Sequence, residues 1–84
     1  MTNSQQLPPP LHVVWRHGGR SADKWRAALR TYVPSEAWKH FYELHDKMQQ
    51  GGVSLRRYVA GEEVLPLGGE VLKHAWSPRA PSRW

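Results

Sequence analysis

One stretch decides the predicted fold: residues 34–50, PSEAWKHFYELHDKMQQ, which two glycines follow directly. The apolar side chains in it recur with the period of one helical stripe, at Ala37, Phe41, Leu44 and Met48. Proline opens the stretch at the position where a helix tolerates it best, and glycine favours a helix end. The pattern therefore predicts a helix over 34–50, about 25 Å long.

The residues before this helix predict a strand and a second helix. Residues 11–16 are rich in β-branched and aromatic side chains, which is typical of a strand. Ser21 is a suitable helix N-cap, and an apolar stripe follows it at Trp25, Ala28, Leu29 and Tyr32. We therefore expect a helix over about 21–32, which ends where Pro34 disfavours helical backbone angles.

Beyond Gly52 the hydrophobic period changes from 3.6 residues to 2, which predicts strands. These strands are expected at about 53–59, 62–67 and 70–76, and Pro66 favours a sheet edge for the middle one. The expected class is α+β, with two helices packed on one face of a small, mostly antiparallel sheet.

The predicted domain organisation has three parts. Residues 1–10 are polar and proline-rich and are expected to be disordered, and residues 11–76 form a single domain. Residues 77–84 form a basic tail that prolines keep from regular structure.

Composition excludes several classes of protein. The chain has no cysteine, which excludes a disulfide framework, thiol catalysis and cysteine-based zinc sites. Its apolar runs are too short for a membrane span, and its N-terminus lacks the pattern of a signal peptide. The expected location is therefore cytoplasmic.

The formal net charge of +5 is spread unevenly. Residues 1–33 carry five basic side chains and one acidic one, and residues 71–84 carry three basic ones and no acidic one. Residues 34–70 carry four basic and six acidic side chains. Basic ends around a slightly acidic centre suggest an anionic partner. The alternative is that the charge serves solubility alone.

The histidines do not predict a metal site. Four of the five fall in pairs five residues apart, His12 with His17 and His40 with His45, and residues five apart on a helix point to different faces. The serines lack the setting of a catalytic nucleophile, and neighbouring helical residues such as His45 and Asp46 diverge. We therefore expect a protein that is not an enzyme and uses no cofactor.

Two sets of side chains are candidates for binding an anion or nucleic acid. Residues 17–21, HGGRS, lead from the first strand to an expected helix N-terminus, which favours anions, and the alternative is a plain turn with an exposed arginine. The larger candidate set consists of basic side chains, and its alternative explanation is a solvated outer face. Its members are Arg16, Arg20, Lys24, Arg26, Arg30, Arg79 and Arg83.

A third candidate is aromatic and is expected to bind a protein partner. Trp38, Tyr42 and His45 line one flank of the long helix, beside its core stripe, and we call them the helix flank. The alternative is that the expected first helix packs across them. Trp84 ends the basic tail and is expected to stack on a base or fill a partner's pocket, unless it folds back on the sheet.

In layout the chain resembles small accessory proteins of bacteriophages and mobile genetic elements. The segments that carry the resemblance are Trp15-Arg16 and residues 51–55, GGVSL. The resemblance implies a host-directed binder, for example an anti-CRISPR-like inhibitor or a modulator of a host nucleic-acid machine.

Two functions follow as expectations. The first is a non-enzymatic inhibitor or modulator that binds a host nucleic-acid-processing protein complex through the helix flank and a basic surface. The alternative is direct nucleic-acid binding with little sequence specificity, in which arginines contact phosphates. The lack of a helix-turn-helix, zinc-finger or RRM-type signature limits this alternative.

Overall fold

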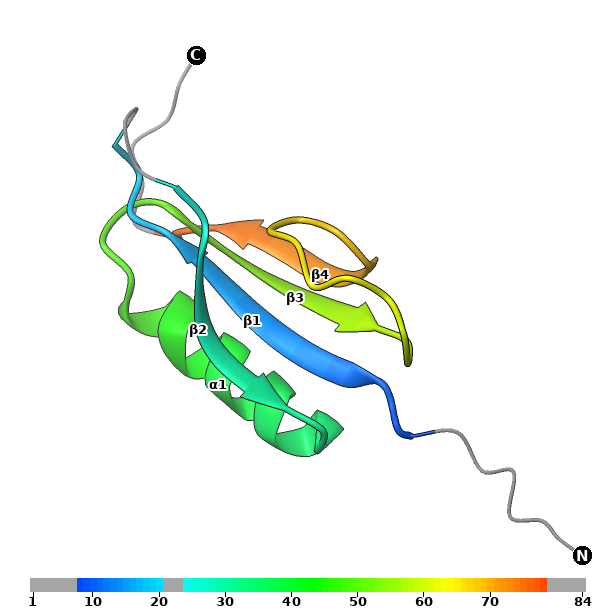
Figure 1. Ribbon diagram of the computed structural model, residues 1–84. Coiled ribbons are helices and arrows are strands. Elements are labelled where there is room, and N and C mark those ends of the chain that lie inside the picture. Colours follow the sequence, from blue (N-terminus) through cyan, green and yellow to red (C-terminus); the bar gives the residue numbers. More distant parts are fainter. Residues whose placement is uncertain (1–7, 21–23, 79–84) are drawn as a thin grey trace, which may run out of the picture.

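The computed structural model describes residues 8–20 and 24–78. Within these ranges the chain forms four strands and one helix, shown in Figure 1. They are β1 (Leu11–His17), β2 (Arg26–Thr31), α1 (Pro34–Lys47), β3 (Gly52–Tyr58) and β4 (Glu70–Trp76). In the described part of the chain, no helix has the length and hydrophobicity needed to cross a membrane.

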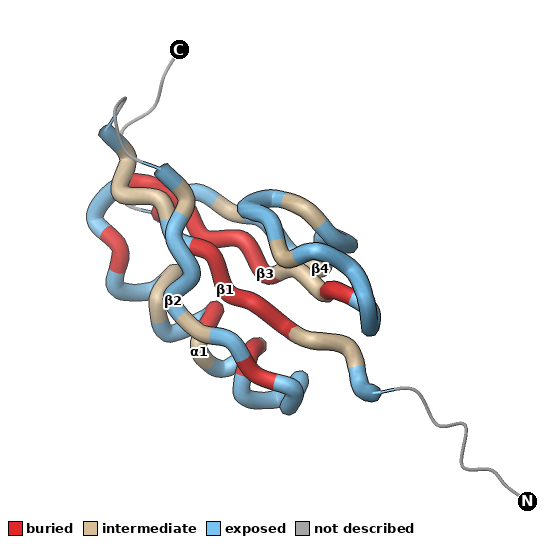
Figure 2. Tube along the Cα trace, viewed as in Figure 1, coloured by how far each residue is buried: buried red, intermediate tan, exposed pale blue. Residues whose placement is uncertain are grey.

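The four strands form one sheet in the order β2-β1-β3-β4, and every neighbouring pair is antiparallel. The helix α1 lies across one face of this sheet (Figure 1). In the central strands, Val14 of β1 pairs with Leu29 of β2 on one side and with Leu55 of β3 on the other. Buried residues accordingly run along β1 and β3 (Figure 2).

The main core lies between α1 and the sheet. The helix contributes Ala37 and Phe41, both fully buried, and Val14, Val53 and Leu55 meet them from the two central strands. This confirms that the stripe of residues 34–50 faces a core. The helix itself ends at Lys47, and Met48 takes an extended backbone while its side chain stays buried.

The β3–β4 connection packs on part of the opposite face of the sheet. The connection between β3 and β4, residues 59–69, packs Val64 against a second cluster of buried side chains, Val13, Trp15 and Tyr58. The Trp15 indole N–H donates to the Tyr58 hydroxyl at 2.9 Å, and that hydroxyl donates to the carbonyl oxygen of Leu65 at 2.6 Å. Burial raises the pKa of Tyr58, so the phenol remains the proton donor that this contact requires.

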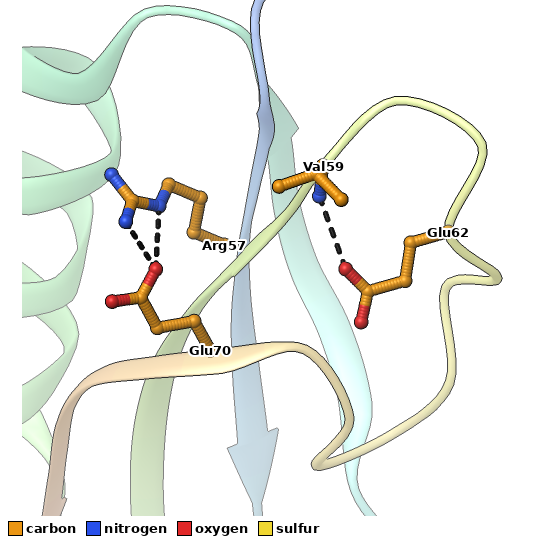
Figure 3. A network of polar contacts seen from close by, with 4 residues as sticks. All are labelled: Arg57, Val59, Glu62 and Glu70. Carbon is orange, nitrogen blue, oxygen red and sulfur yellow. Dashed lines mark hydrogen bonds and ion pairs between the residues drawn. The ribbon is translucent and has the colours of Figure 1, made fainter.

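Two polar contacts hold the ends of the β3–β4 connection (Figure 3). At its end, the Arg57 guanidinium donates to the Glu70 carboxylate across the first pair of the β3–β4 ladder. At its start, the Val59 N–H donates to a Glu62 carboxylate oxygen at 3.1 Å. Both pairs are exposed, so they fix the course of the connection more than they add to stability.

The expectation of a second helix over about 21–32 is wrong. Residues 26–31 form β2, and residues 21–23, including the expected cap Ser21, lie outside the described residues. The local helix propensity is overridden because one edge of β1 pairs with β3, and β2 satisfies the N–H and C=O groups of its other edge. As a strand, β2 also brings Leu29 and Thr31 to the face that α1 covers.

The expected strand at about 62–67 is also absent. Pro66 has no N–H to give to a ladder, and Leu67 adopts a positive φ of 62°, which breaks an extended run. The carbonyl of Leu65 accepts from Gly68 N–H and from the Tyr58 hydroxyl instead of a neighbouring strand. The other expected strands, 11–16, 53–59 and 70–76, are confirmed to within one residue at each end as β1, β3 and β4.

Three segments meet at Gly51, between α1 and β3. Its φ is +88°, and an added Cβ would lie 1.9 Å from the carbonyl oxygen of His17, at the end of β1. Its own carbonyl accepts from the N–H of Ser77, just beyond β4, at 2.7 Å. The Ser77 hydroxyl also donates to the Met48 carbonyl at 2.6 Å. The β1–β2 turn, the end of α1 and the end of β4 are therefore held together at one end of the sheet.

His12 gives a prediction about stability. It is 4% exposed, and its ring nitrogen Nδ1 has no hydrogen-bond partner among the described residues. Because an unsatisfied buried polar atom costs about 1–3 kcal/mol, His12→Leu is expected to raise the free energy of unfolding by about 1 kcal/mol. Thermal denaturation should then show a midpoint about 4–8 °C higher. A lower midpoint would show that the imidazole is satisfied.

Candidate functional site

An aromatic cluster occupies the end of the sheet's second face that lies away from the β3–β4 connection. It consists of His17, Trp25, His74 and Trp76, which we call the aromatic platform. Ring centroids lie 5.2 Å apart for His17–Trp25, 5.3 Å for Trp25–His74 and 6.0 Å for Trp25–Trp76. His17 and Trp25 come from the two sides of the β1–β2 connection, and His74 and Trp76 come from β4, far along the sequence.

Strand alternation explains why these rings gather. His17 follows Trp15 by two residues on β1, so both point to the face opposite α1. His74 and Trp76 alternate in the same way on β4, where they pair with Ser54 and Gly52 of β3. Trp25 directly precedes β2 and packs against the buried cluster that contains Trp15.

The Trp76 ring of the platform packs on the sheet at Gly52, and its other side is exposed. Trp76 is 56% exposed, whereas Trp15 beside the platform is only 4% exposed. A Cβ added at Gly52 would lie 2.8 Å from Trp76 Cε3, so glycine leaves the space in which this ring rests on the strand. An aromatic ring that is held in place and still open to solvent can stack with a planar ligand.

The environment of His74 gives a prediction about pH. Burial lowers the pKa of His74 below its ordinary value of 6.5, and the positive charge of Arg56 lowers it further. The unfolded chain therefore binds this proton more readily, so the contribution of His74 to stability falls as pH drops below about 6.5. Urea denaturation at pH 5.5 and 7.5 should show a smaller pH dependence in His74→Asn than in the wild type. An equal pH dependence would contradict the assignment.

Three of the predicted basic residues converge. Arg16, Lys24 and Arg26, with Gly18, line an open pocket of about 260 Å³, which we call the basic pocket. Arg16 and Arg26 are direct partners in the β1–β2 ladder. They lie on the helix side of the sheet, and the aromatic platform lies on the other side of the same hairpin end.

Among the other predicted basic residues, the two that the structure describes, Arg20 and Arg30, do not line this pocket. Arg20 is exposed in the turn after β1. In the expected helix, Arg30 would lie on the same side as Arg26, four residues before it. In the strand it pairs with Val13 and points to the opposite face. A bulge in the β1–β2 ladder, at Ala28, reverses the alternation between the two arginines. The predicted residues Arg79, Arg83 and Trp84 lie outside the described residues.

The helix flank is partly open. Trp38 is half-buried against the main core, and its ring stacks on Tyr42 with centroids 5.9 Å apart. Tyr42 is 50% exposed. The Nε2 atom of His45 lies 3.1 Å from the carbonyl oxygen of Trp76, which ties the flank to the end of β4. The alternative, in which a helix over about 21–32 packs across the flank, is contradicted because residues 26–31 form β2.

Sequence reasoning missed the aromatic platform as a site. It expected a strand over about 70–76, which contains His74 and Trp76, and it placed Trp25 in a helical stripe. The signal that the sequence offers is spacing: Trp15 with His17, and His74 with Trp76, are each two residues apart in a strand pattern. What it does not offer is the strand order that brings the two pairs to the same end of the sheet.

No protein-family model, curated protein or solved structure matches this chain. Across residues 8–20 and 24–78, no group of three or more His, Asp or Glu side chains is arranged to hold a metal ion. The assignment of function therefore rests on the chemistry of the aromatic platform, the basic pocket and the helix flank.

Proposed function

We propose that this protein binds single-stranded nucleic acid, without catalysing a reaction on it, through the aromatic platform. The observation that carries the proposal is the position of Trp76 and Trp25. They lie on a sheet face that α1 does not cover, next to two imidazole rings. Bases of a single strand are free to stack on such rings, whereas duplex bases are already stacked on each other.

Charge supports the same function. The chain has a formal net charge of +5 and a pI of about 10.1, and the described basic pocket adjoins the hairpin end that carries His17 and Trp25. Stacking on aromatic rings tolerates every base, and arginine and lysine contact phosphates without reading sequence. The expected binding is therefore strong at low salt and weakly dependent on sequence.

Fluorescence anisotropy tests the proposal. Labelled dT12, U12 and a 12-base-pair duplex are titrated with the full chain at 50, 100, 200 and 300 mM salt. We expect the single strands to bind more tightly than the duplex. Their log affinity should fall linearly with log salt, by about 0.7 for each phosphate contacted. Absence of binding at 50 mM salt, or preference for the duplex, would overturn the proposal.

The exposure of Tyr42 favours a second candidate function. A half-exposed tyrosine stacked on a tryptophan is typical of an anchor in a protein interface. Together with the resemblance to bacteriophage accessory proteins, it supports an inhibitor that binds a host nucleic-acid-processing complex through the helix flank.

Affinity capture from bacterial lysate distinguishes this candidate from the first. We compare the wild type with Tyr42→Ala and Trp76→Ala after nuclease treatment. An inhibitor of the second kind should retain one protein complex with the wild type and with Trp76→Ala, and lose it with Tyr42→Ala. Equal capture by all three chains would contradict a role for the helix flank.

A further inference from the structure

We propose that the basic pocket is a phosphate site, which holds a backbone phosphate of the strand whose bases stack on the aromatic platform. The inference rests on the proposed function for its natural ligand, but the pocket can be tested by itself with a small anion. It assigns a role to Arg16, Lys24 and Arg26, which the packing of the fold does not require because all three are exposed.

The register of β1 and β2 is the first argument. Arg16 and Arg26 are directly opposite each other in an antiparallel ladder. Like charges in that position destabilise a sheet, whereas almost any neutral or acidic residue would fit an exposed position. Lys24 adds a third positive charge two residues before Arg26. A bound anion would remove this repulsion.

The shape and lining of the pocket are the second argument. The pocket is open to solvent, has a volume of about 260 Å³, and is lined by the three cations and Gly18. Within the described residues, none of the side chains that line the pocket is acidic. The Arg57–Glu70 ion pair lies away from it, between β3 and β4. Guanidinium groups bind phosphate oxygens in pairs, so a pocket with two of them suits a tetrahedral phosphate group, whose oxygens can accept from both.

The position of the pocket on the hairpin links it to the platform. Arg16 precedes His17 and Lys24 precedes Trp25, so each cation is a chain neighbour of a platform ring. Neighbouring residues of a strand point to opposite faces, and β2 is an edge strand of the sheet. A single-stranded nucleic acid whose bases stack on the platform can thus continue around the β2 edge and place a backbone phosphate in the basic pocket.

The test compares a pocket variant with a charge-matched control. The pocket variant is Arg16→Gln with Arg26→Gln. The control is Lys39→Gln with Lys73→Gln, which removes the same charge from α1 and from β4, the strand at the other edge of the sheet. Binding of dT12 is measured by anisotropy across the salt series, and binding of inorganic pyrophosphate is measured by shifts of backbone amide NMR signals.

We expect the pocket variant to bind dT12 about tenfold more weakly at 50 mM salt than the control does, equivalent to one charge-assisted hydrogen bond. Its salt slope should be smaller by about 0.7, the value for one phosphate on a single strand. Pyrophosphate should shift the amides of Gly18 and Lys24 in the wild type and not in the pocket variant. Thermal denaturation without ligand should show the pocket variant at least as stable as the wild type, because the like-charge pair is gone.

The outcomes separate the two proposals. If dT12 binds and the pocket variant matches the control, the phosphate site is overturned and the proposed function stands. If dT12 does not bind but pyrophosphate does, and the pocket variant loses it, the phosphate site stands and the nucleic-acid function fails. If neither probe binds the wild type, both are overturned. A pocket variant that is markedly less stable than the wild type would give the arginines a structural role and contradict the inference.

Discussion

Gly51→Ala is expected to unfold much of the protein. The backbone φ of +88° is unfavourable for alanine, and the new Cβ would lie 1.9 Å from the His17 carbonyl and 2.8 Å from the Gly18 carbonyl carbon. These are backbone atoms, which cannot swing aside as a flexible side chain can. We expect the free energy of unfolding to fall by about 4 kcal/mol or more, a large part of the stability of a domain this small.

Gly61→Ala is the matched control for this variant. Gly61 has nearly the same φ, +87°, but no atom lies within 4 Å of an added Cβ. Its expected cost is only the conformational one, about 1 kcal/mol. Urea denaturation followed by circular dichroism compares the two variants. Equal losses of stability would show that Gly51 contributes only its backbone angles and does not join the three segments.

Trp76→Ala is expected to have the largest effect on binding without unfolding the chain. The side chain is 56% exposed, so its loss removes little buried surface. Stacking of one base on one aromatic ring contributes about 1–3 kcal/mol, so the affinity for dT12 should fall by about 5- to 150-fold. The measurement is anisotropy at 100 mM salt, and the loss should persist at each salt concentration because stacking is not screened.

Tyr42→Ala provides the control for this effect. Tyr42 is exposed to a similar extent, 50%, but it belongs to the helix flank on the other side of the sheet. Its removal should leave the affinity for dT12 unchanged. If both variants lose affinity equally, dT12 does not bind one face of the sheet in preference to the other, and the aromatic platform is not its specific binding site.

The parts of the fold that could be predicted are those with a strong local pattern. The stripe from Ala37 to Met48 predicts an amphipathic helix, the β-branched and aromatic side chains of 11–16 predict a strand, and the period of two beyond Gly52 predicts the strand at 70–76. Residues 26–31 carry no such pattern: Ala27, Ala28 and Leu29 favour a helix locally. Their strand conformation is set by pairing with β1, which is a long-range interaction that a local pattern does not contain.

The same distinction applies to the candidate sites. Arg16, Lys24 and Arg26 were predicted as anion-binding residues, and the structure brings them together. Arg16 and Arg26 are partners in the β1–β2 ladder, and Lys24 lies just before β2. Arg30 was predicted with them and lies on the other face, because one bulge residue reverses the alternation. The aromatic platform depends on the strand order β2-β1-β3-β4, which places the ends of β1 and β4 on either side of Gly52.

The most direct test of the aromatic platform uses its tryptophans as reporters. The chain has five tryptophans, and each gives a separate indole N–H signal in a ¹⁵N NMR spectrum, assigned with single Trp→Phe variants. On titration with dT12, we predict that the signals of Trp25 and Trp76 move while those of Trp15 and Trp38 stay in place. Movement of Trp38 with Trp25 and Trp76 unchanged would place the strand on the helix flank and contradict the central claim.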